Sequence, residues 1–204
     1  MIQVTRKTSE SEMTVRLSEG PVAQDYRSKI KTPLPFLSHM IEQLVWRSGF
    51  NVETIVSLSD FQLAHLVTED LGQAVGKAFG AYLKKTDGAP GFGDGFGIID
   101  EAMAHTLLSF ESRAYFAFHP ESDVSPDVEG MASEELLVFL DAFAQGANCT
   151  IQIDLKRGEN THHIWEAVFR SFGLALKAAL TPDHSRRGMT SGVAGEVSFD
   201  VSEI

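Results

Sequence analysis

Two histidines and a glutamate lie close together near the end of the chain, in the segment NTHHIWEAVF. His162 and Glu166 are four residues apart and His163 and Glu166 three, so on a helix all three side chains would share one face. His65 and Glu69 repeat the four-residue spacing. Imidazole and carboxylate groups on one helical face make half of a site for a divalent cation such as Mn²⁺, Fe²⁺, Co²⁺ or Zn²⁺. The same spacing also occurs in surface ion pairs, and spacing alone leaves both interpretations open.

A cation held at either pair would need ligands from another part of the chain, because one helical turn offers too few donors. His39, in the segment FLSHMIEQ, is the candidate for that role. We expect it on a helix that precedes the first His/Glu pair.

The chain repeats itself at a fixed distance. The segment SGFNVETI begins at Ser48, and QGANCTIQ, with Gly and Asn at the same places, begins at Gln145. The shift of 97 residues that joins them also carries the first His/Glu pair onto the second. This predicts an internal duplication with its boundary in KTDGAPGFGDGFG, residues 85–97. The predicted halves are 1–93 and 94–204, the second with a C-terminal arm, fused into one globular unit.

Each half has the same predicted order of elements: alternating strands, an amphipathic helix, a strand and a second helix. The strands are EMTVRLSEG and VETIVSL in the first half, and AHTLLSFESRAYFAFH and CTIQIDL in the second. The helices are expected over residues 36–48, 65–84, 133–146 and 162–181. This order predicts an α+β fold whose helices cover one face of each sheet and pack between the two sheets. The polar segment 183–204 is expected to be a strand-like arm or a mobile tail.

The composition argues against several classes of function. The formal net charge is −11, so the chain has no excess of cations to displace the counterions of nucleic acid. The single cysteine, Cys149, excludes an internal disulfide. No apolar run is long enough to span a membrane and the N-terminal residues lack a signal-peptide core, so the default expectation is a cytoplasmic protein.

Taken together, these stretches resemble the imidazoleglycerol-phosphate dehydratases, manganese enzymes of histidine biosynthesis. The segment GENTHHIWEAVFRSFGLAL resembles the family's G-x-N-x-H-H-x-x-E-x-x-F-K-A, and TPLPFLSHMIEQ resembles T-G-I-x-F-L-D-H-M-L-x-Q. HLVTEDLGQAVG stands where H-H-T-V-E-D occurs, and RKTSESEM, IIDEAM and FESRAYF match shorter family segments. The resemblance covers nearly the whole chain. It implies an α+β fold with two duplicated halves of the ribosomal protein S5 domain 2 type.

The resemblance also implies roles for individual residues. The implied metal ligands, for Mn²⁺ foremost, are His39, His65, Glu69, His162, His163 and Glu166. The expected catalytic carboxylates are Glu10, Glu69 and Glu166. The expected substrate contacts are Gln43, Arg113 and Arg170, the last in place of a family lysine. Asp100 and Glu101 match an acidic pair for which either a supporting role in the site or a plain loop role is open.

Several family positions are altered in this chain. Leu66 stands for the second histidine of the first motif and Gln152 for a histidine on a strand. Leucine cannot bind a metal and glutamine offers only a neutral oxygen, so one of the two family metal centres is expected to be weak or lost. In the phosphate site Gly91 replaces an arginine, Met189 a serine and Ser191 a lysine. The loss of cations favours a less charged or smaller anion than a phosphate monoester.

The family reaction removes water from a glycerol side chain on an imidazole ring, which binds between two metals that stabilise the charge developing on it. With one centre altered, we expect a diverged metal-dependent lyase with a different small, anionic substrate. Two alternatives stay open: the true dehydratase of histidine biosynthesis, and a non-catalytic relative that keeps the fold. Because the family builds trimers that assemble into 24-subunit shells with metal sites shared between chains, we also expect a homo-oligomer.

Overall fold

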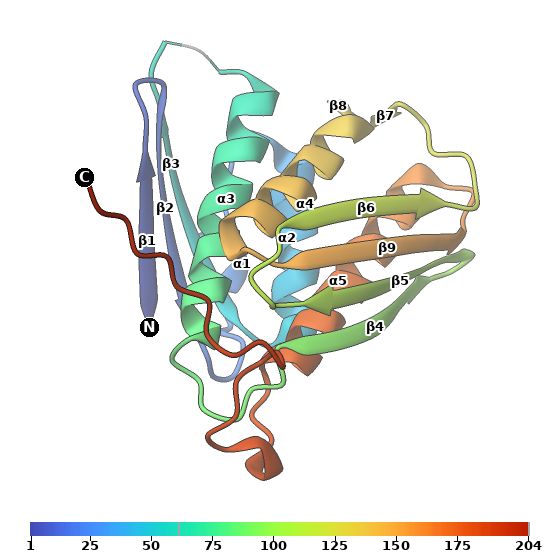
Figure 1. Cartoon of the computed structure of the whole chain (residues 1–204). Coiled ribbons are helices and arrows are strands. Elements are labelled where there is room, and N and C mark those ends of the chain that lie inside the picture. Colours follow the sequence, from blue (N-terminus) through green and yellow to red (C-terminus); the bar gives the residue numbers. More distant parts are fainter. Residues whose placement is uncertain (61, 204) are drawn as a thin grey trace.

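The computed structural model describes residues 1–60 and 62–203, in which two β-sheets form the outer layers and the long helices lie between them (Figure 1). This arrangement confirms the predicted α+β fold with helices packed between two sheets. None of the helices in these residues has the length and apolarity needed to cross a membrane.

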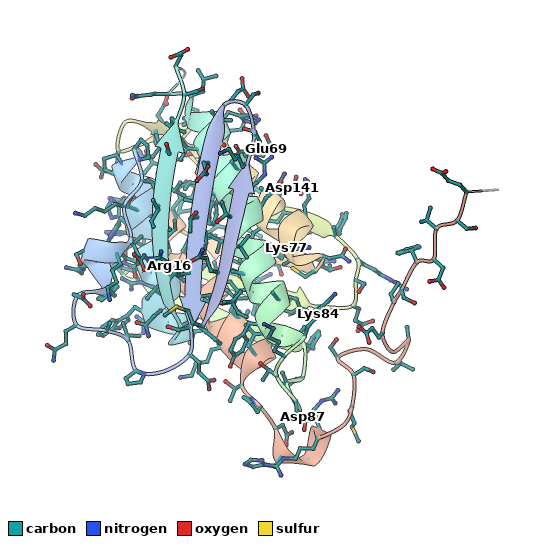
Figure 2. The ribbon with its side chains drawn as sticks, turned by 90° about the vertical axis from the view of Figure 1, so that its left-hand side faces the viewer. Arg16, Glu69, Lys77, Lys84, Asp87 and Asp141 are labelled. Atoms are coloured by element: carbon teal, nitrogen blue, oxygen red, sulfur yellow. The ribbon has the colours of Figure 1, made fainter. Side chains whose placement is uncertain are left out.

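The first sheet is antiparallel, with the strand order β1-β2-β3. Its strands are β1 (Ile2–Lys7), β2 (Ser11–Ser18) and β3 (Asn51–Leu58). Burial alternates along β2, and its buried side chains Met13, Val15 and Leu17 face the helices. Arg16 lies on the opposite face (Figure 2), where its Nη1 is 3.2 Å from the carboxylate of Glu53.

The second sheet has the order β4-β5-β9-β6. Its strands are β4 (Phe92–Ile99), β5 (Ala102–Ser109), β6 (Tyr115–Pro120) and β9 (Thr150–Arg157). The pairs β4–β5 and β5–β9 are antiparallel, whereas β6 runs parallel to β9. A separate small hairpin consists of β7 (Asp127–Val128) and β8 (Met131–Ala132).

The helices fill the space between the sheets. They are α1 (Tyr26–Lys29), α2 (Pro35–Ser48), α3 (Ala64–Leu83), α4 (Ser133–Ala147) and α5 (Thr161–Leu180), followed by a short 3₁₀ turn, His184–Arg186. Helix α3 packs against α4 and against the first sheet, while α5 packs against α2 and the second sheet. Large buried side chains join these layers into one core, among them Phe79, Phe143, Trp165, Phe169 and Phe172.

Strand β4 brings α5 unusually close to the second sheet through three glycines. An added Cβ would lie 2.2 Å from a backbone oxygen of α5 at Gly93, 2.7 Å at Gly95 and 2.1 Å at Gly97. Because these glycines alternate along the strand, its helix-facing side carries no side chain from Gly93 to Gly97, and the α5 backbone lies directly on it. The glycine-rich segment that we expected at the boundary between the halves is therefore, from Phe92 on, a packed strand.

The predicted long helices agree with the observed ones to within one residue at each end, but four strands were missed: the short β7 and β8 and two longer ones. The longer ones are β1, in the N-terminal segment for which we expected no signal-peptide core and assigned no strand, and β4. Between Thr181 and Glu203 the described chain forms the 3₁₀ turn and no strand, so it does not form the strand-like arm within this chain. The division at residues 93 and 94 stays a prediction, although that limit falls inside β4.

Candidate metal centre

The first turn of α5 is fixed by its cap. The side chain of Asn160 accepts hydrogen bonds from the backbone N–H of His162 at 2.9 Å and of His163 at 3.4 Å. This cap satisfies N–H groups that have no partner inside the helix and so starts the helix at one defined residue. As a result, His162 and His163 lie in the first turn of α5, one turn before Glu166.

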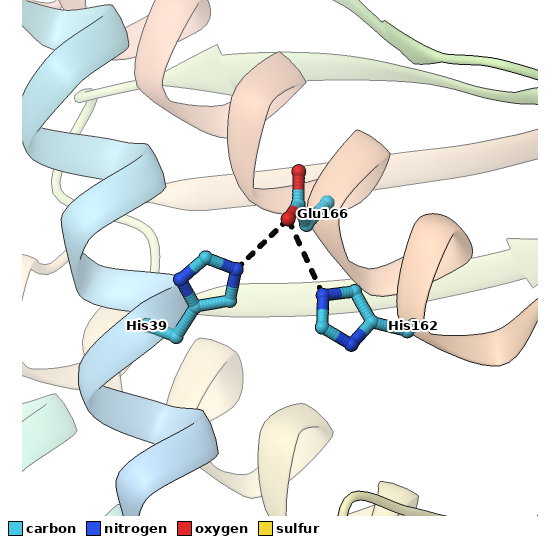
Figure 3. Close-up of side chains that lie close together, drawn as sticks. All are labelled: His39, His162 and Glu166. Atoms are coloured by element: carbon cyan, nitrogen blue, oxygen red, sulfur yellow. Dashed lines mark hydrogen bonds and ion pairs between the residues drawn. The ribbon is translucent and has the colours of Figure 1, made fainter.

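His39, His162 and Glu166 converge where α2 meets α5 (Figure 3). His39 Nε2 lies 2.8 Å and His162 Nε2 3.3 Å from the same oxygen, Glu166 Oε1. One donor atom from each of the three residues lies within 4.8 Å of the others. The structure thus brings together three of the six expected ligands, from helices more than 100 residues apart in sequence.

Glu166 is the buried centre of this group, with a residue exposure of 6 %. Burial raises the pKa of its carboxyl group, but hydrogen bonds from His39 and His162 and the charge of Arg170 outweigh that effect and leave the pKa below its usual value. Arg170 donates Nη2–H to Glu166 Oε2, Nε–H to Gln43 Oε1 at 3.0 Å and Nη1–H to the backbone oxygen of Ile98 at 3.0 Å. Glu166 therefore stays ionised, with Oε2 bound to Arg170 and Oε1 directed at the two imidazoles.

These donors fit a divalent cation by their chemistry. Two imidazole nitrogens and one carboxylate oxygen are a donor set that Zn²⁺, Mn²⁺ and their neighbours accept. Where an imidazole nitrogen faces a carboxylate oxygen, a proton or a cation must lie between them, because two lone pairs repel. Glu166 Oε1 faces two such nitrogens, so one cation could replace two protons.

His163 belongs to a second group, with Asp100 and Glu101. Its Nδ1 lies 2.9 Å from Glu101 Oε2, and this hydrogen bond raises the pKa of the imidazole. Glu101 also accepts the backbone N–H of Asn160 at 2.9 Å, and that bond, with the one from His163, lowers the carboxyl pKa to about 2. Glu101 thus connects the β4–β5 turn to the start of α5 and holds His163.

The first His/Glu pair is far more open. His65 Nε2 lies 3.7 Å from Glu69 Oε2, and the side chains are 63 % and 44 % exposed. Glu135, on α4, lies 3.6 Å from His65 Nδ1 and accepts a hydrogen bond from Thr68. Leu66, where the family resemblance expected a histidine, follows directly and offers no donor. This pair therefore lies outside the cluster formed by His39, His162 and Glu166.

Gln152 lies on the outer face of the second sheet. Its neighbours along β9, Ile151 and Ile153, are buried against the helices, so alternation turns Gln152 away from them. Within one chain it does not share a face with the metal-candidate residues of α5.

The expected substrate residues are divided between different parts of the chain. Gln43 contacts Arg170 beside the Glu166 cluster. Arg113 instead precedes β6, at the end of the sheet where β6 and β9 begin, whereas Glu101 lies before β5 at the opposite end. Glu10 lies in the turn between β1 and β2, where its backbone oxygen accepts the N–H of Ser59.

Residues that resemblance assigned to the phosphate site lie side by side. An added Cβ at Gly91 would be 2.2 Å from Ser191 Cβ, and Ser191 Oγ donates to the backbone oxygen of Phe110 at 2.9 Å. A cavity of about 540 Å³ adjoins them; its lining includes Ser191, Met189, Lys77, Lys84 and Lys85. Figure 2 shows two of these lysines, Lys77 on α3 and Lys84 directly after its end, beside the edge strand β1.

The sequence reading missed three carboxylates that face the other ring nitrogen of the histidines. Glu42 lies 3.6 Å from His39 Nδ1, Glu129 2.9 Å from His162 Nδ1 and Glu135 3.6 Å from His65 Nδ1. Glu42 could have been found, because it follows His39 by three residues on a helix. Glu129 and Glu135 are distant in sequence from the histidines that they contact, so no local spacing predicts either contact.

Comparison with known proteins finds the same family by sequence model and by individual relatives. The sequence model of a family described as "Imidazoleglycerol-phosphate dehydratase" matches residues 32–176. An imidazoleglycerol-phosphate dehydratase of Staphylococcus epidermidis is 32 % identical over 186 residues, which cover 91 % of this chain and 94 % of the relative. That of Deinococcus radiodurans is 32 % identical over 191 residues, covering 93 % and 96 %.

Solved structures agree with the sequence matches. The crystal structure of imidazoleglycerol-phosphate dehydratase from Staphylococcus aureus has a TM-score of 0.75 at 27 % identity and covers 89 % of this chain and all of that one. The enzyme from Pyrococcus furiosus, in complex with (S)-C348, has a TM-score of 0.77 at 25 % identity and covers 95 % and 99 %.

Proposed function

Because the chain belongs to the imidazoleglycerol-phosphate dehydratase family, a family of metal-dependent hydro-lyases, we propose that it is a diverged metal-dependent lyase with a different substrate. His39, His162 and Glu166 would hold one divalent cation, Mn²⁺ foremost. The observation that carries this proposal is the pair of imidazole nitrogens, from α2 and α5, that face one oxygen of a buried carboxylate.

A bound cation would stabilise negative charge that develops on the substrate when a proton is removed. The residues of this chain prepare for that role. Arg170 and its three acceptors orient Glu166, and Glu101 orients His163 as a further ligand. Glu10 and Glu69 are the proposed carboxylates for proton transfer, since both are free of ion pairs to arginine or lysine in the described residues.

A different substrate is supported by the residues around the expected anion site. Gly91, Met189 and Ser191 carry no charge, and Arg170 already has acceptors for three of its N–H groups. Each missing charge-assisted hydrogen bond to a phosphate would cost about 1.5 to 3 kcal/mol of binding free energy. The substrate we propose is therefore a small anion with weaker charge than a phosphate monoester.

The second candidate is imidazoleglycerol-phosphate dehydration itself, in histidine biosynthesis. It is favoured by the curated relatives named above, which carry that name and match more than 90 % of this chain. Under this function the losses at Leu66 and Gln152 would be tolerated.

We also propose that the site is completed in a homo-oligomer, built on trimers as in the family and extending to a 24-subunit shell. Two observations support assembly. The Glu166 cluster and Arg113 are near opposite ends of the second sheet, so a substrate that touches both needs two chains. The outer face of that sheet also exposes large apolar side chains, namely Phe92, Phe96, Ile98 and Tyr115, each more than half exposed.

The test combines metal binding with substrate comparison. Purified protein, stripped of metal and free of any histidine tag, is titrated with Mn²⁺, beside the variant His39→Ala. The Mn²⁺-loaded protein is then assayed for water loss from imidazoleglycerol phosphate and from an analogue that carries a singly charged carboxylate in place of the phosphate.

Three results separate the candidates. The diverged lyase is supported if Mn²⁺ binding depends on His39 and the rate of water loss is hardly higher with the phosphate than with the carboxylate analogue. A large preference for the phosphorylated substrate, together with complementation of a histidine auxotroph, replaces it with the second candidate. Absence of both metal binding and turnover rejects both and leaves a non-catalytic relative.

A further inference from the structure

We infer that Glu129 is a positioning residue for the metal centre: it fixes the orientation of the His162 imidazole and holds the proton on its Nδ1. This inference rests on the proposed function, because it concerns how His162 is presented to the cation. Nothing in the sequence pattern around Glu129 suggests such a role.

The contact itself is direct. Glu129 Oε1 lies 2.9 Å from His162 Nδ1, whereas His162 Nε2 lies 3.3 Å from Glu166 Oε1. A carboxylate at Nδ1 keeps the hydrogen there and leaves the lone pair of Nε2 for a cation, the arrangement typical of histidine ligands in metal sites. The His162 ring also packs against Phe36: the two ring centroids are 5.1 Å apart, and the ring planes meet at 63°.

The turn that carries Glu129 is costly for a glutamate. Val128 pairs with Met131, so Glu129 and Gly130 form a two-residue hairpin loop, and both have positive φ angles, 49° and 76°. Two positive φ angles define the turn type in which Asn-Gly is strongly preferred. A glutamate has no local side-chain contact that favours this conformation, so the turn gives up stability at this position.

The strained turn allows the contact between Glu129 and His162, which a shorter side chain at this position could not make. The side chain of Glu129 is 58 % exposed and its ion pair in the described residues is with His162. Asparagine would suit the backbone better, but it lacks one methylene group and its amide would not reach His162 Nδ1. The position therefore combines an unfavourable backbone with the side-chain length that the contact requires.

The neighbouring histidine has the same kind of partner. His163 Nδ1 lies 2.9 Å from Glu101 Oε2, so the two adjacent imidazoles of α5 each have a carboxylate at Nδ1. Glu101 is additionally fixed by backbone N–H groups, whereas Glu129 depends on its strained turn. His162 is consequently the imidazole whose orientation a turn mutation can change.

The experiment uses three substitutions in the full-length protein. Glu129→Asn relieves the turn and removes the contact, Glu129→Gly does the same without a side chain, and Glu129→Gln keeps both the backbone strain and an oxygen within reach. Asp127→Asn, in the same hairpin, removes one negative charge without touching His162 and is the matched control. Mn²⁺ affinity is measured by competition with a chelator. The protonated ring nitrogen of His162 is identified by ¹⁵N NMR on metal-free and Zn²⁺-loaded protein.

We expect Glu129→Asn and Glu129→Gly to bind Mn²⁺ about 10- to 100-fold more weakly, while the metal-free proteins melt at the same or a higher temperature. Glu129→Gln should lose less than about tenfold, because its oxygen still accepts the Nδ1 hydrogen. The NMR signature should move away from Nδ1–H in the Asn and Gly variants only.

Unchanged affinity in Glu129→Asn and Glu129→Gly would overturn the inference. An equal loss in Asp127→Asn would also overturn it, since the effect would then be one of net charge. If the wild-type protein binds neither Mn²⁺ nor Zn²⁺, the proposed function fails. The metal-free NMR comparison then still decides whether Glu129 sets the proton on His162.

Discussion

The first turns of α3 and α5 carry the same His-x-x-x-Glu spacing, 97 residues apart, but they lie in different surroundings. In α5 the glutamate is buried and shares one oxygen with two imidazoles. In α3 the side chains are 63 % and 44 % exposed, and within the described residues the ion pair of Glu69 is with His65, at 3.7 Å. A shared spacing on two helices therefore produced one assembled cluster and one open pair.

The residue after each glutamate shows how the two helices are anchored. Asp70 in α3 is 2 % exposed, forms an ion pair with Arg6 at 2.6 Å and accepts a hydrogen bond from Ser11. The matching residue in α5, Ala167, has its backbone oxygen against Gly97 of β4. Helix α3 is thus fixed by a buried charge to the β1–β2 hairpin, and α5 by close contact of backbone with strand.

This contrast teaches that ligand spacing on a helix is not enough to form a site; the supporting elements decide which pair is closed. The pair on α3 leaves its donors open to solvent, whereas the cluster on α5 brings three donor residues together within one chain. Each of the following changes tests one side of that comparison.

The largest effect is expected at the anchor of α3. Asp70→Ala should lower the free energy of unfolding by about 3 to 5 kcal/mol, because Arg6 and Ser11 lose a buried partner. Urea denaturation of the metal-free protein measures this. A loss as small as that of a surface substitution would show that Asp70 does not anchor α3.

The two glutamates should respond very differently. Glu166→Ala should lower the free energy of unfolding by about 2 to 4 kcal/mol, since it leaves Arg170 and two imidazoles without their shared acceptor. Glu69→Ala should cost less than about 0.5 kcal/mol, as expected for an exposed pair. Thermal and chemical denaturation of metal-free samples give both values, and similar losses in the two variants would contradict the contrast between the helices.

The glycine contact of α5 should be the next most sensitive. Gly97→Ala places a Cβ 2.1 Å from Ala167 O unless the helix shifts, and overpacking of this kind costs about 1 to 3 kcal/mol. Because α5 carries His162 and Glu166, the variant should also bind Mn²⁺ more weakly. Gly130→Ala would be the wrong control, as its φ is positive; Ala132→Gly serves better.

The smallest effect is a pH dependence at the start of α5. The pKa of Glu101 is about 2 in the folded chain, below its ordinary 4.5, so its contribution to stability is complete above about pH 4.5 and is lost as the pH falls toward 2. The pKa of His163 is raised above 6.5, so its contribution is complete below pH 6.5 and is lost as the pH rises through the folded pKa.

Glu101→Gln should remove both contributions. The difference in unfolding free energy between wild type and variant should therefore be largest between about pH 4.5 and 6.5 and shrink on either side. Denaturation curves across this range, without metal, measure it. A difference that does not vary with pH would exclude the Glu101–His163 interaction.

Periodic segments of the sequence were sufficient to predict the helices and the layer arrangement, because the apolar side chains of α2 to α5 recur at helical spacing. They were not sufficient for β1, whose exposed residues are polar, or for β4, whose helix-facing positions are glycines and carry no hydrophobic signal. The metal-candidate cluster followed from the spacing of His162 and Glu166. Its partner carboxylate Glu129 depends on how a distant hairpin folds back, which no local pattern records.

The glycines of β4 have one more consequence. Strand β4 contributes none of the candidate ligands, but it sets the distance between α5 and the sheet. All the candidate ligands on α5 therefore depend on that one distance. A substitution of a single side chain on α5 leaves this distance unchanged, whereas a side chain added at Gly93, Gly95 or Gly97 would displace the whole helix. The position of the candidate site therefore depends on three glycines, Gly93, Gly95 and Gly97, that contribute no side chain to it.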